Sequence, residues 1–262
     1  LTSTNNSLST SMERLSSGLR VNSAKDDAAG LAIANRMTSQ IRGMTVATRN
    51  AGDGISLAQT AEAAMGELTS TMQRMRDLGI QAANTGSVTS EDREKLQNEF
   101  SQLNEELTRI IQNTEFNGKK ILNGSVSGGV AFQVGPNTST NNIIEISIED
   151  LSGSLANVTL ASIGSMATSA LIFSTINSID TAIKTIDTAR SKLGAAQNRF
   201  TTTISNLQSS IENQSAARSR IMDADFAAET ATLSRDQILQ QAGTAMLSQA
   251  NQRPQAVLSL LQ

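Results

Sequence analysis

The chain has 262 residues, a formal net charge of −3 and a pI near 5.1, which argues against nucleic-acid binding because such proteins carry a basic excess. It contains no Cys and no His, so disulfides, thiol nucleophiles and the commonest general base and metal ligand are excluded, and we expect neither an enzyme nor a cofactor. Aromatic residues make up only 2% of the chain and no apolar stretch approaches the ~20 residues of a membrane span, so aliphatic helix seams must form the core.

The first predicted element is a helix over residues 2–17, with apolar residues spaced four, three and four apart. These residues are Leu8, Met12, Leu15 and Leu19. A polar joint follows, because Gly18 interrupts the helix and residues 23–30 are typical of a loop. A second helix is expected over 28–42, ending near Gly43. Within the joint, the carboxylates of Asp26 and Asp27 suit the start of that helix.

Two heptad patterns come next, after a loop or weakened turn expected at residues 50–56. The first consists of Ala61, Met65, Leu68, Met72 and Met75, and the second of Leu96, Phe100, Leu103, Leu107 and Ile110. The first helix is predicted to end near residues 84–86. Thr89 or Ser90 is predicted to cap the second.

Between residues 116 and 165 the apolar residues recur at every second position, which is the pattern of a β-strand. "VAFQVG" (130–135) and "NIIEISIED" (142–150) are predicted strands, with Ile144, Ile146 and Ile148 on one face, and "NVTLASIG" (157–164) is a third candidate strand. One hairpin or three short strands therefore separate two helical halves.

The longest repeat lies in the second half, over residues 176–211, and predicts a coiled-coil helix of about five heptads. Its frame contains Ile176, Ile179, Ile183, Ile186, Leu193, Phe200, Ile204, Leu207 and Ile211. The last segment, 223–262, is rich in Ala and Gln and carries an apolar stripe that needs a partner, either the first helix or another subunit. The stripe includes Leu233, Ile238, Leu239, Ala242, Met246, Leu247, Val257, Leu258 and Leu261.

The expected fold is mainly α, a long antiparallel coiled-coil-like helical rod with a small β-hairpin tip. Several long segments resemble bacterial flagellins. They are "ERLSSGLRVNSAKDDAAGLAIANRM" (13–37), "RNAGDGISLAQTAEAAM" (49–65), "MQRMRDLGIQAAN" (72–84), "TEFNGKKIL" (114–122), "LGAAQNRF" (193–200), "ARSRIMDADFAAE" (217–229) and "SRDQILQQAGTAMLSQANQRPQAVLSLL" (234–261). The resemblance omits about 123–175, too short for the family's variable outer domains, and the family's usual first stretch is expected to be missing before Leu1.

The resemblance implies a structural subunit of the flagellar filament, exported through the flagellar type III pathway and located outside the cell. Residues 1–28 and 222–262 would form an inner, channel-lining layer, and residues 29–221 an outer core with its β tip at about 118–165. Lys25, Asp26 and Asp27 would lie in the joint between the layers, either contacting other subunits or capping the next helix. Implied partners are copies of the chain, an export chaperone bound to the terminal helix 234–261, and filament cap and junction proteins.

The resemblance also implies recognition by an animal innate-immune receptor. The matching positions are Gln73, Arg74, Leu78, Glu99, Ile179 and Ile183. Ile179 and Ile183 also fit the coiled-coil core, and a contact between subunits is the alternative role for Arg74. Asp223 and Asp225 form a D-x-D pair, but no third ligand suggests a metal site. The competing functions are a hook-filament junction protein and a surface adhesin built on the same rod.

Overall fold

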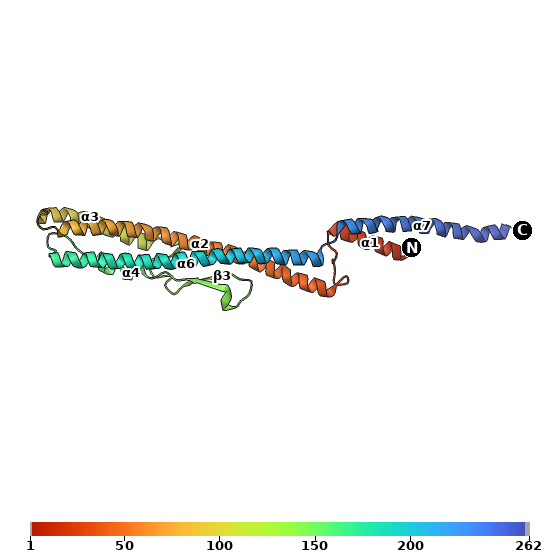
Figure 1. Ribbon diagram of the computed structural model, residues 1–262, viewed down its shortest axis with the longest axis horizontal. Helices are drawn as coiled ribbons and strands as arrows, with labels where there is room; N and C mark the ends of the chain where they lie inside the picture. Colours follow the sequence, from red (N-terminus) through yellow and green to blue (C-terminus); the bar gives the residue numbers. More distant parts are fainter. Residues whose placement is uncertain (1, 260–262) are drawn as a thin grey trace. The chain divides into compact units, whose positions relative to one another are not determined.

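The computed structural model describes the backbone of residues 2–259, and their side chains except at 154 and 251–259. The helices are α1 (Thr2–Ser17), α2 (Ala28–Ala83), α3 (Ser90–Asn113), α4 (Leu151–Ser154), α5 (Ala156–Thr159), α6 (Ser169–Met222) and α7 (Phe226–Ser259). The strands are β1 (Glu115–Phe116), β2 (Lys119–Lys120), β3 (Val130–Gln133) and β4 (Ile143–Ile146). The expected mainly α fold with a small antiparallel β part is confirmed (Figure 1).

The described residues form two compact units. Unit 1 contains the residues up to Arg42 and those from Ser209 onward, and unit 2 contains Gly43–Gln208. The N- and C-terminal segments thus fold together in unit 1, as expected for helices that need partners.

Unit 2 is built on antiparallel helices. Gly79 of α2 lies against Ile176 near the start of α6, whereas Gly54 lies against Phe200, much later in α6. Residues later in α6 therefore contact residues earlier in α2, so the two helices run antiparallel. A short turn at residues 84–89 makes α3 the antiparallel neighbour of α2, and Thr89 caps α3 by accepting a hydrogen bond from the Asp92 amide at 3.2 Å.

The predicted heptads form the core of unit 2. All five residues predicted on α2 are fully buried, as are Phe100 and Leu107 of α3. On α6 one half of the predicted frame is buried at strict seven-residue intervals, namely Ile179, Ile186, Leu193, Phe200 and Leu207. The other half, at Ile176, Ile183 and Ile204, is only partly buried. The second buried row instead contains Thr175, Ala182 and Ala189.

The helix end predicted near Gly43 and the loop at 50–56 are wrong, because α2 continues unbroken to Ala83. Both errors arise from treating a glycine as the end of a helix, whereas here it lets another chain segment pack closely against the helix. A Cβ at Gly43 would lie 3.0 Å from the Pro136 Cβ, and one at Gly54 would lie 2.7 Å from the Phe200 ring. These glycines allow other chain segments to approach the helix and do not terminate it.

The β segment packs against the flank of the helices instead of extending beyond their ends. Asn50 Nδ2 of α2 donates to the Gln133 carbonyl at 2.9 Å, and the rings of Phe132 and Phe200 meet edge to face at 5.6 Å. The predicted β3–β4 hairpin is confirmed, and Ile144, Ile146 and Ile148 are buried. Their apolar face requires a helix surface to cover it, which places the hairpin beside α2 and α6.

The third candidate strand, 157–164, is wrong. The segment instead begins within the short helix α5, which follows α4. The Asp150 carboxylate accepts from the amides of Ser152 and Gly153 and starts the first helical turn. Leu155 and Val158 are buried at a spacing of three, which is a helical and not a strand period.

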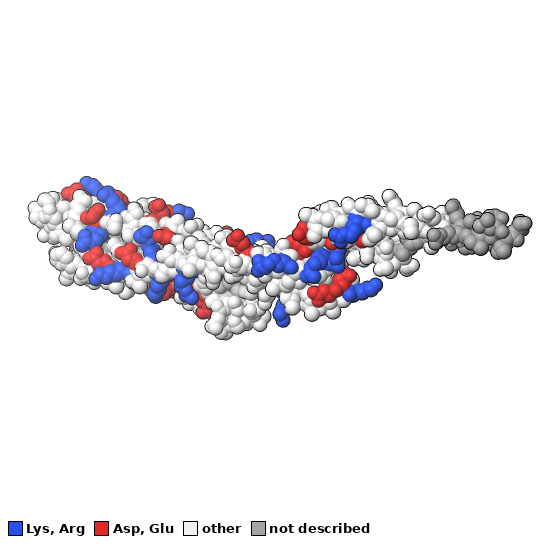
Figure 2. Space-filling view, turned by 45° about the vertical axis from the view of Figure 1, so that its right-hand side comes forward, with Lys and Arg blue, Asp and Glu red and all other residues white. Residues whose placement is uncertain are grey.

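The surface of unit 2 carries interspersed charges of both signs, visible on the left of Figure 2. Several of them pair between helices, as in Arg76–Asp180 at 2.7 Å between α2 and α6. Such exposed pairs contribute about 0–1 kcal/mol each. The buried seam is therefore the main source of stability.

We predict that Gly54→Ala destabilises the chain by about 1–3 kcal/mol, because the new methyl group would overlap the Phe200 ring. Gly66→Ala is the matched control on the same helix, since nothing lies within 4 Å of its Cβ position, and it should stabilise by about 0.4–1 kcal/mol. Urea unfolding monitored by circular dichroism measures both. Equal effects of the two substitutions would contradict the packing role of Gly54.

Candidate functional site

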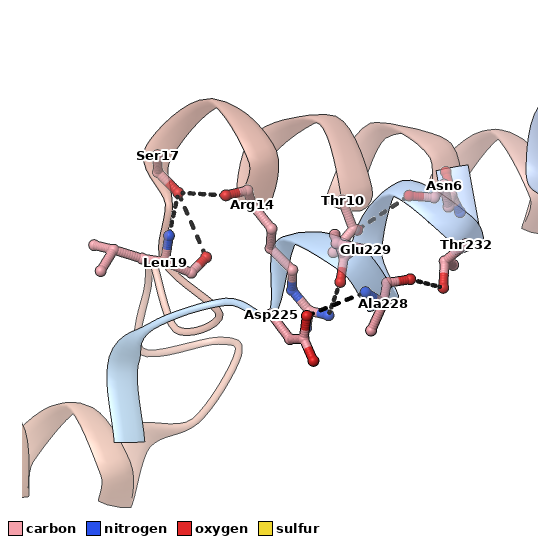
Figure 3. A network of polar contacts seen from close by, with 9 residues as sticks. All are labelled: Asn6, Thr10, Arg14, Ser17, Leu19, Asp225, Ala228, Glu229 and Thr232. Atoms are coloured by element: carbon pink, nitrogen blue, oxygen red, sulfur yellow. Dashed lines mark hydrogen bonds and ion pairs between the residues drawn. The ribbon is translucent and has the colours of Figure 1, made fainter. Parts of the chain in front are cut away.

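The two terminal helices of unit 1 pair antiparallel through polar side chains. Near one end Gln240 Nε2 of α7 donates to Asn5 Oδ1 of α1 at 2.8 Å. Near the other end Arg14 Nη1 lies 3.7 Å from Glu229 Oε2, in the polar network of Figure 3. A shallow pocket between α1 and α7 is likewise lined only by polar residues, among them Thr10 and Thr232.

The buried side chains between these helices are also polar. Ser11 of α1 and Asp236 of α7 are both at least nine-tenths buried. Asp236 Oδ2 has no hydrogen-bond partner among the described residues. Because an unsatisfied buried polar atom costs free energy, the pair gains little stability from its own interface.

The apolar side chains of the pair lie largely on the outside. Ile238 and Met246 are each 66% exposed, and Met12, Phe226, Leu239 and Leu247 are exposed as well. Leu8, Leu15 and Leu19 of the predicted stripe are half-buried. The side chains of Val257 and Leu258, and the whole of Leu261, fall outside the described residues. Within the described chain no helix combines the length and hydropathy that crossing a bilayer would require.

The joint after α1 pairs with the segment between α6 and α7. Leu19 and Asp223 form an antiparallel bridge, flanked by hydrogen bonds from the Arg20 amide to the Met222 carbonyl and from the Ala224 amide to the Gly18 carbonyl. Gly18 has a φ of 72°, the left-handed conformation that ends α1. No side-chain pattern predicts this pairing, because its hydrogen bonds use backbone groups.

The acidic residues of the joint cap and brace it. Asp27 Oδ1 accepts from the Gly30 amide at 2.7 Å at the start of α2, which is the bond expected of a capping residue. Asp26 Oδ2 accepts from the amides of Asn22 and Ser23 and from the Ser23 hydroxyl. These bonds, chiefly those from Ser23, hold the pKa of the Asp26 carboxyl below its ordinary value. Lys25 is exposed and has no partner among the described residues.

The D-x-D pair is also structural. Asp225 Oδ1 accepts from the Ala227 and Ala228 amides and caps α7, while the Asp223 carboxylate accepts from the Ser219 hydroxyl. Each carboxylate therefore already bonds within its own chain. The described residues contain no group of three potential ligands positioned for a metal ion.

The residues implied in receptor recognition divide into two groups. Gln73, Arg74 and Glu99 are exposed, and Arg74 donates through Nε and Nη2 to Glu99 Oε1 at 2.9 and 2.7 Å. Leu78 and Ile179 are fully buried in the core of unit 2. Ile183 packs partly buried against the same core.

These features define a class of protein, a helical subunit whose terminal helices expose apolar surface for association. Comparison with known proteins identifies the family. The bacterial flagellin N-terminal helical region matches residues 1–127, and the bacterial flagellin C-terminal helical region matches residues 176–261. The chain belongs to the bacterial flagellin family and is a structural subunit of a flagellar filament.

Relatives and solved structures agree with this assignment. The chain is 47% identical to a flagellin of Halalkalibacterium halodurans over 95% of this chain and 90% of the relative. It is 43% identical to a flagellin of Bacillus subtilis over 100% of this chain and 95% of the relative. The crystal structure of Bacillus cereus flagellin aligns with a TM-score of 0.53 and 29% identity, over 65% of this chain and 94% of that one.

A putative flagellar hook-associated protein from Vibrio parahaemolyticus aligns with a TM-score of 0.64 over 76% of this chain and 100% of that chain. Its identity is only 12%, so this likeness concerns the fold alone. The junction-protein alternative is therefore not favoured over the filament subunit.

We predict that the Asp26 carboxylate stabilises the joint above its ordinary pKa of 3.8 and that this stabilisation is lost as the pH falls through the lower folded pKa. The amide signal of Ser23 should therefore titrate with a midpoint below 3.8 in an NMR pH series. Asp26→Asn should abolish this titration. A midpoint above 3.8 in the unmodified chain would contradict the bonding described for Asp26.

Proposed function

We propose that the chain assembles into its filament through the outward apolar side chains of α1 and α7. Residues 1–28 and 222–262 would form the inner, channel-lining layer, and residues 29–221 the outer core. The observation that carries the proposal is the exposure of Ile238, Leu239, Met246 and Leu247 on a helix pair whose fully buried side chains are polar. Copies of the chain would cover these side chains, at about 25 cal/mol for each Å² of apolar surface removed from water.

The same exposed stripe supports an export step before assembly. A subunit with uncovered apolar helices would associate too early, so a chaperone that covers residues 234–261 fits a path through the flagellar type III pathway to the outside of the cell. Filament cap and junction proteins would then meet the same surface. In this proposal the role is structural and not enzymatic.

We predict that Ile238→Lys raises the critical concentration for filament growth at least about tenfold. The substitution removes one apolar contact of about 1.5–3 kcal/mol per added subunit, and 1.4 kcal/mol corresponds to a factor of ten. Gln241→Lys, also exposed on α7, is the control for added charge and should have a smaller effect. Sedimentation after addition of short filament seeds measures both variants.

Normal growth of Ile238→Lys filaments would show that α7 is not part of the assembly surface. Failure of the unmodified chain, completed with any preceding residues, to form pelletable filaments would contradict the filament function itself. Circular dichroism of the monomers checks that helix content is unchanged.

A second proposed role is recognition of the monomer by an innate-immune receptor. It rests on the family resemblance and on the exposed group of Gln73, Arg74 and Glu99, in which a guanidinium and a carboxylate lie on adjacent helices. The contacts would come from these polar side chains, because Leu78 and Ile179 are already buried. Those two residues would instead support the helices that carry the exposed group.

We predict that Arg74→Ala weakens receptor binding by about 1–3 kcal/mol, the range for an anchoring arginine at an interface. Arg109→Ala is the matched control, since Arg109 is also exposed and paired with a glutamate, Glu106, but lies outside the group. Binding of purified monomer to the receptor ectodomain, by surface plasmon resonance, distinguishes them. Equal affinities for the two variants would exclude Arg74 from the recognition surface.

A further inference from the structure

Methionine is the main oxidation-sensitive residue type of this chain. The sequence has nine methionines and contains no Cys, His, Tyr or Trp. A peroxide that meets the chain therefore finds the methionine thioethers as its chief targets. Each thioether reacts only as fast as the oxidant reaches its sulfur, so the exposure of the side chains sets the order of reaction.

The nine methionines fall into three classes of exposure. Four of them are buried on α2, and two others, Met37 and Met222, are half-buried. The buried residues are Met44, Met65, Met72 and Met75. In contrast, Met166 is 94% exposed, Met246 is 66% exposed and Met12 is 57% exposed. These last three side chains are the ones that an oxidant reaches first.

Two of the three exposed methionines belong to the apolar surface of the terminal helices. On α7, Met246 follows Leu239 and Ala242 at spacings of seven and four residues, which places the three exposed side chains on one face of the helix. On α1, Met12 is the exposed member of the predicted apolar stripe. A chemical change at either residue therefore alters the surface through which we propose that the chain assembles.

The third exposed methionine, Met166, belongs to a different surface. It lies in the segment before α6 in unit 2, which is held to α3 because Arg93 Nη1 donates to the neighbouring Ala167 carbonyl at 2.9 Å. Met166 is thus the most readily oxidised of the three and contributes nothing to the apolar stripes of α1 and α7. This difference supplies an internal control.

Oxidation of methionine replaces an apolar group by a polar one. The thioether sulfur forms a bond to one oxygen atom of the peroxide and loses two electrons, while the O–O bond breaks and the other oxygen leaves as water. The oxygen of the resulting sulfoxide is a hydrogen-bond acceptor. Covering it with apolar surface costs free energy, whereas covering a thioether with the same surface is favourable.

We propose that Met12 and Met246 are sulfoxidation sites through which a peroxide prevents assembly of the chain. The proposal rests on the filament function, because it requires that other copies cover the apolar side chains of α1 and α7. In the reduced state the flexible thioethers adapt to a covering surface. A methionine sulfoxide reductase would return both residues to that state, so the modification is reversible.

The test oxidises purified full-length monomer with hydrogen peroxide, removes the peroxide, and measures growth from short filament seeds by sedimentation. Met12→Leu combined with Met246→Leu removes both thioethers and keeps apolar side chains of similar volume. Met166→Leu is the matched control, because it removes the most exposed thioether and leaves α1 and α7 unchanged. Peptide mass spectrometry locates each added oxygen atom, and circular dichroism checks that helix content is retained.

We expect positions 12, 166 and 246 to oxidise at least about tenfold faster than the four buried methionines. Relative to its own untreated material, the oxidised unmodified chain should need at least about tenfold more monomer for growth, as should oxidised Met166→Leu, whereas the oxidised double variant should need less than about twofold more. Treatment with methionine sulfoxide reductases should restore growth of the unmodified chain.

Three results would overturn the proposal. They are equal losses of growth in the unmodified chain and the double variant, normal growth of a chain that carries sulfoxide at both positions, and failure of growth to return after both sulfoxides are reduced. Failure of the untreated chain to form filaments would instead contradict the filament function. In that case the order of oxidation among the nine methionines would still test the assignment of the two sites.

Discussion

The placement of apolar side chains on the terminal helices governs what the chain does. α1 and α7 meet through Asn5, Gln240, Arg14 and Glu229, while Ile238 and Met246 point to solvent. A helix pair arranged in this way gains little from its own interface and gains much when other molecules cover its outer side. In the proposed function, assembly would bury the apolar side chains that unit 1 leaves exposed, which is what a polymer subunit requires.

Unit 2 buries its apolar side chains within a single chain. Its helices bury Met65, Met72, Phe100 and Phe200 completely, and the β3–β4 hairpin closes the core against α2. This core does not depend on a partner, so unit 2 has the means to remain folded whether or not the chain is assembled. Unit 2 therefore has an internal core, whereas unit 1 carries the apolar surface that is left exposed. Within unit 1, the backbone pairing of Leu19 with Asp223 joins the two connecting segments.

Periodicity predicted the elements well wherever apolar residues faced a partner within the chain, as in Ala61–Met75 of α2. It failed at Gly43 and Gly54, because a sequence does not reveal that Pro136 or Phe200 will approach a helical glycine. It also could not tell which way the stripe of α7 faces, since a stripe covered by a neighbouring helix and one left open have the same spacing. In the joint, the capping role of Asp27 was predictable from local chemistry, whereas the backbone pairing of residues 18–21 with 221–224 was not.

The seven-residue repeat of α6 determines both which residues face the core and which face solvent. A straight helix drifts by about 20° per heptad against such a repeat, or roughly 80° over four heptads. The buried row of Ile179, Ile186, Leu193 and Phe200 shows that α6 keeps the same side toward the core over this length. The seam that stabilises unit 2 therefore also keeps residues that are seven positions apart, such as the exposed Thr181 and Thr188, on one outer side. Packing inside the unit in this way fixes which side chains of α6 face solvent.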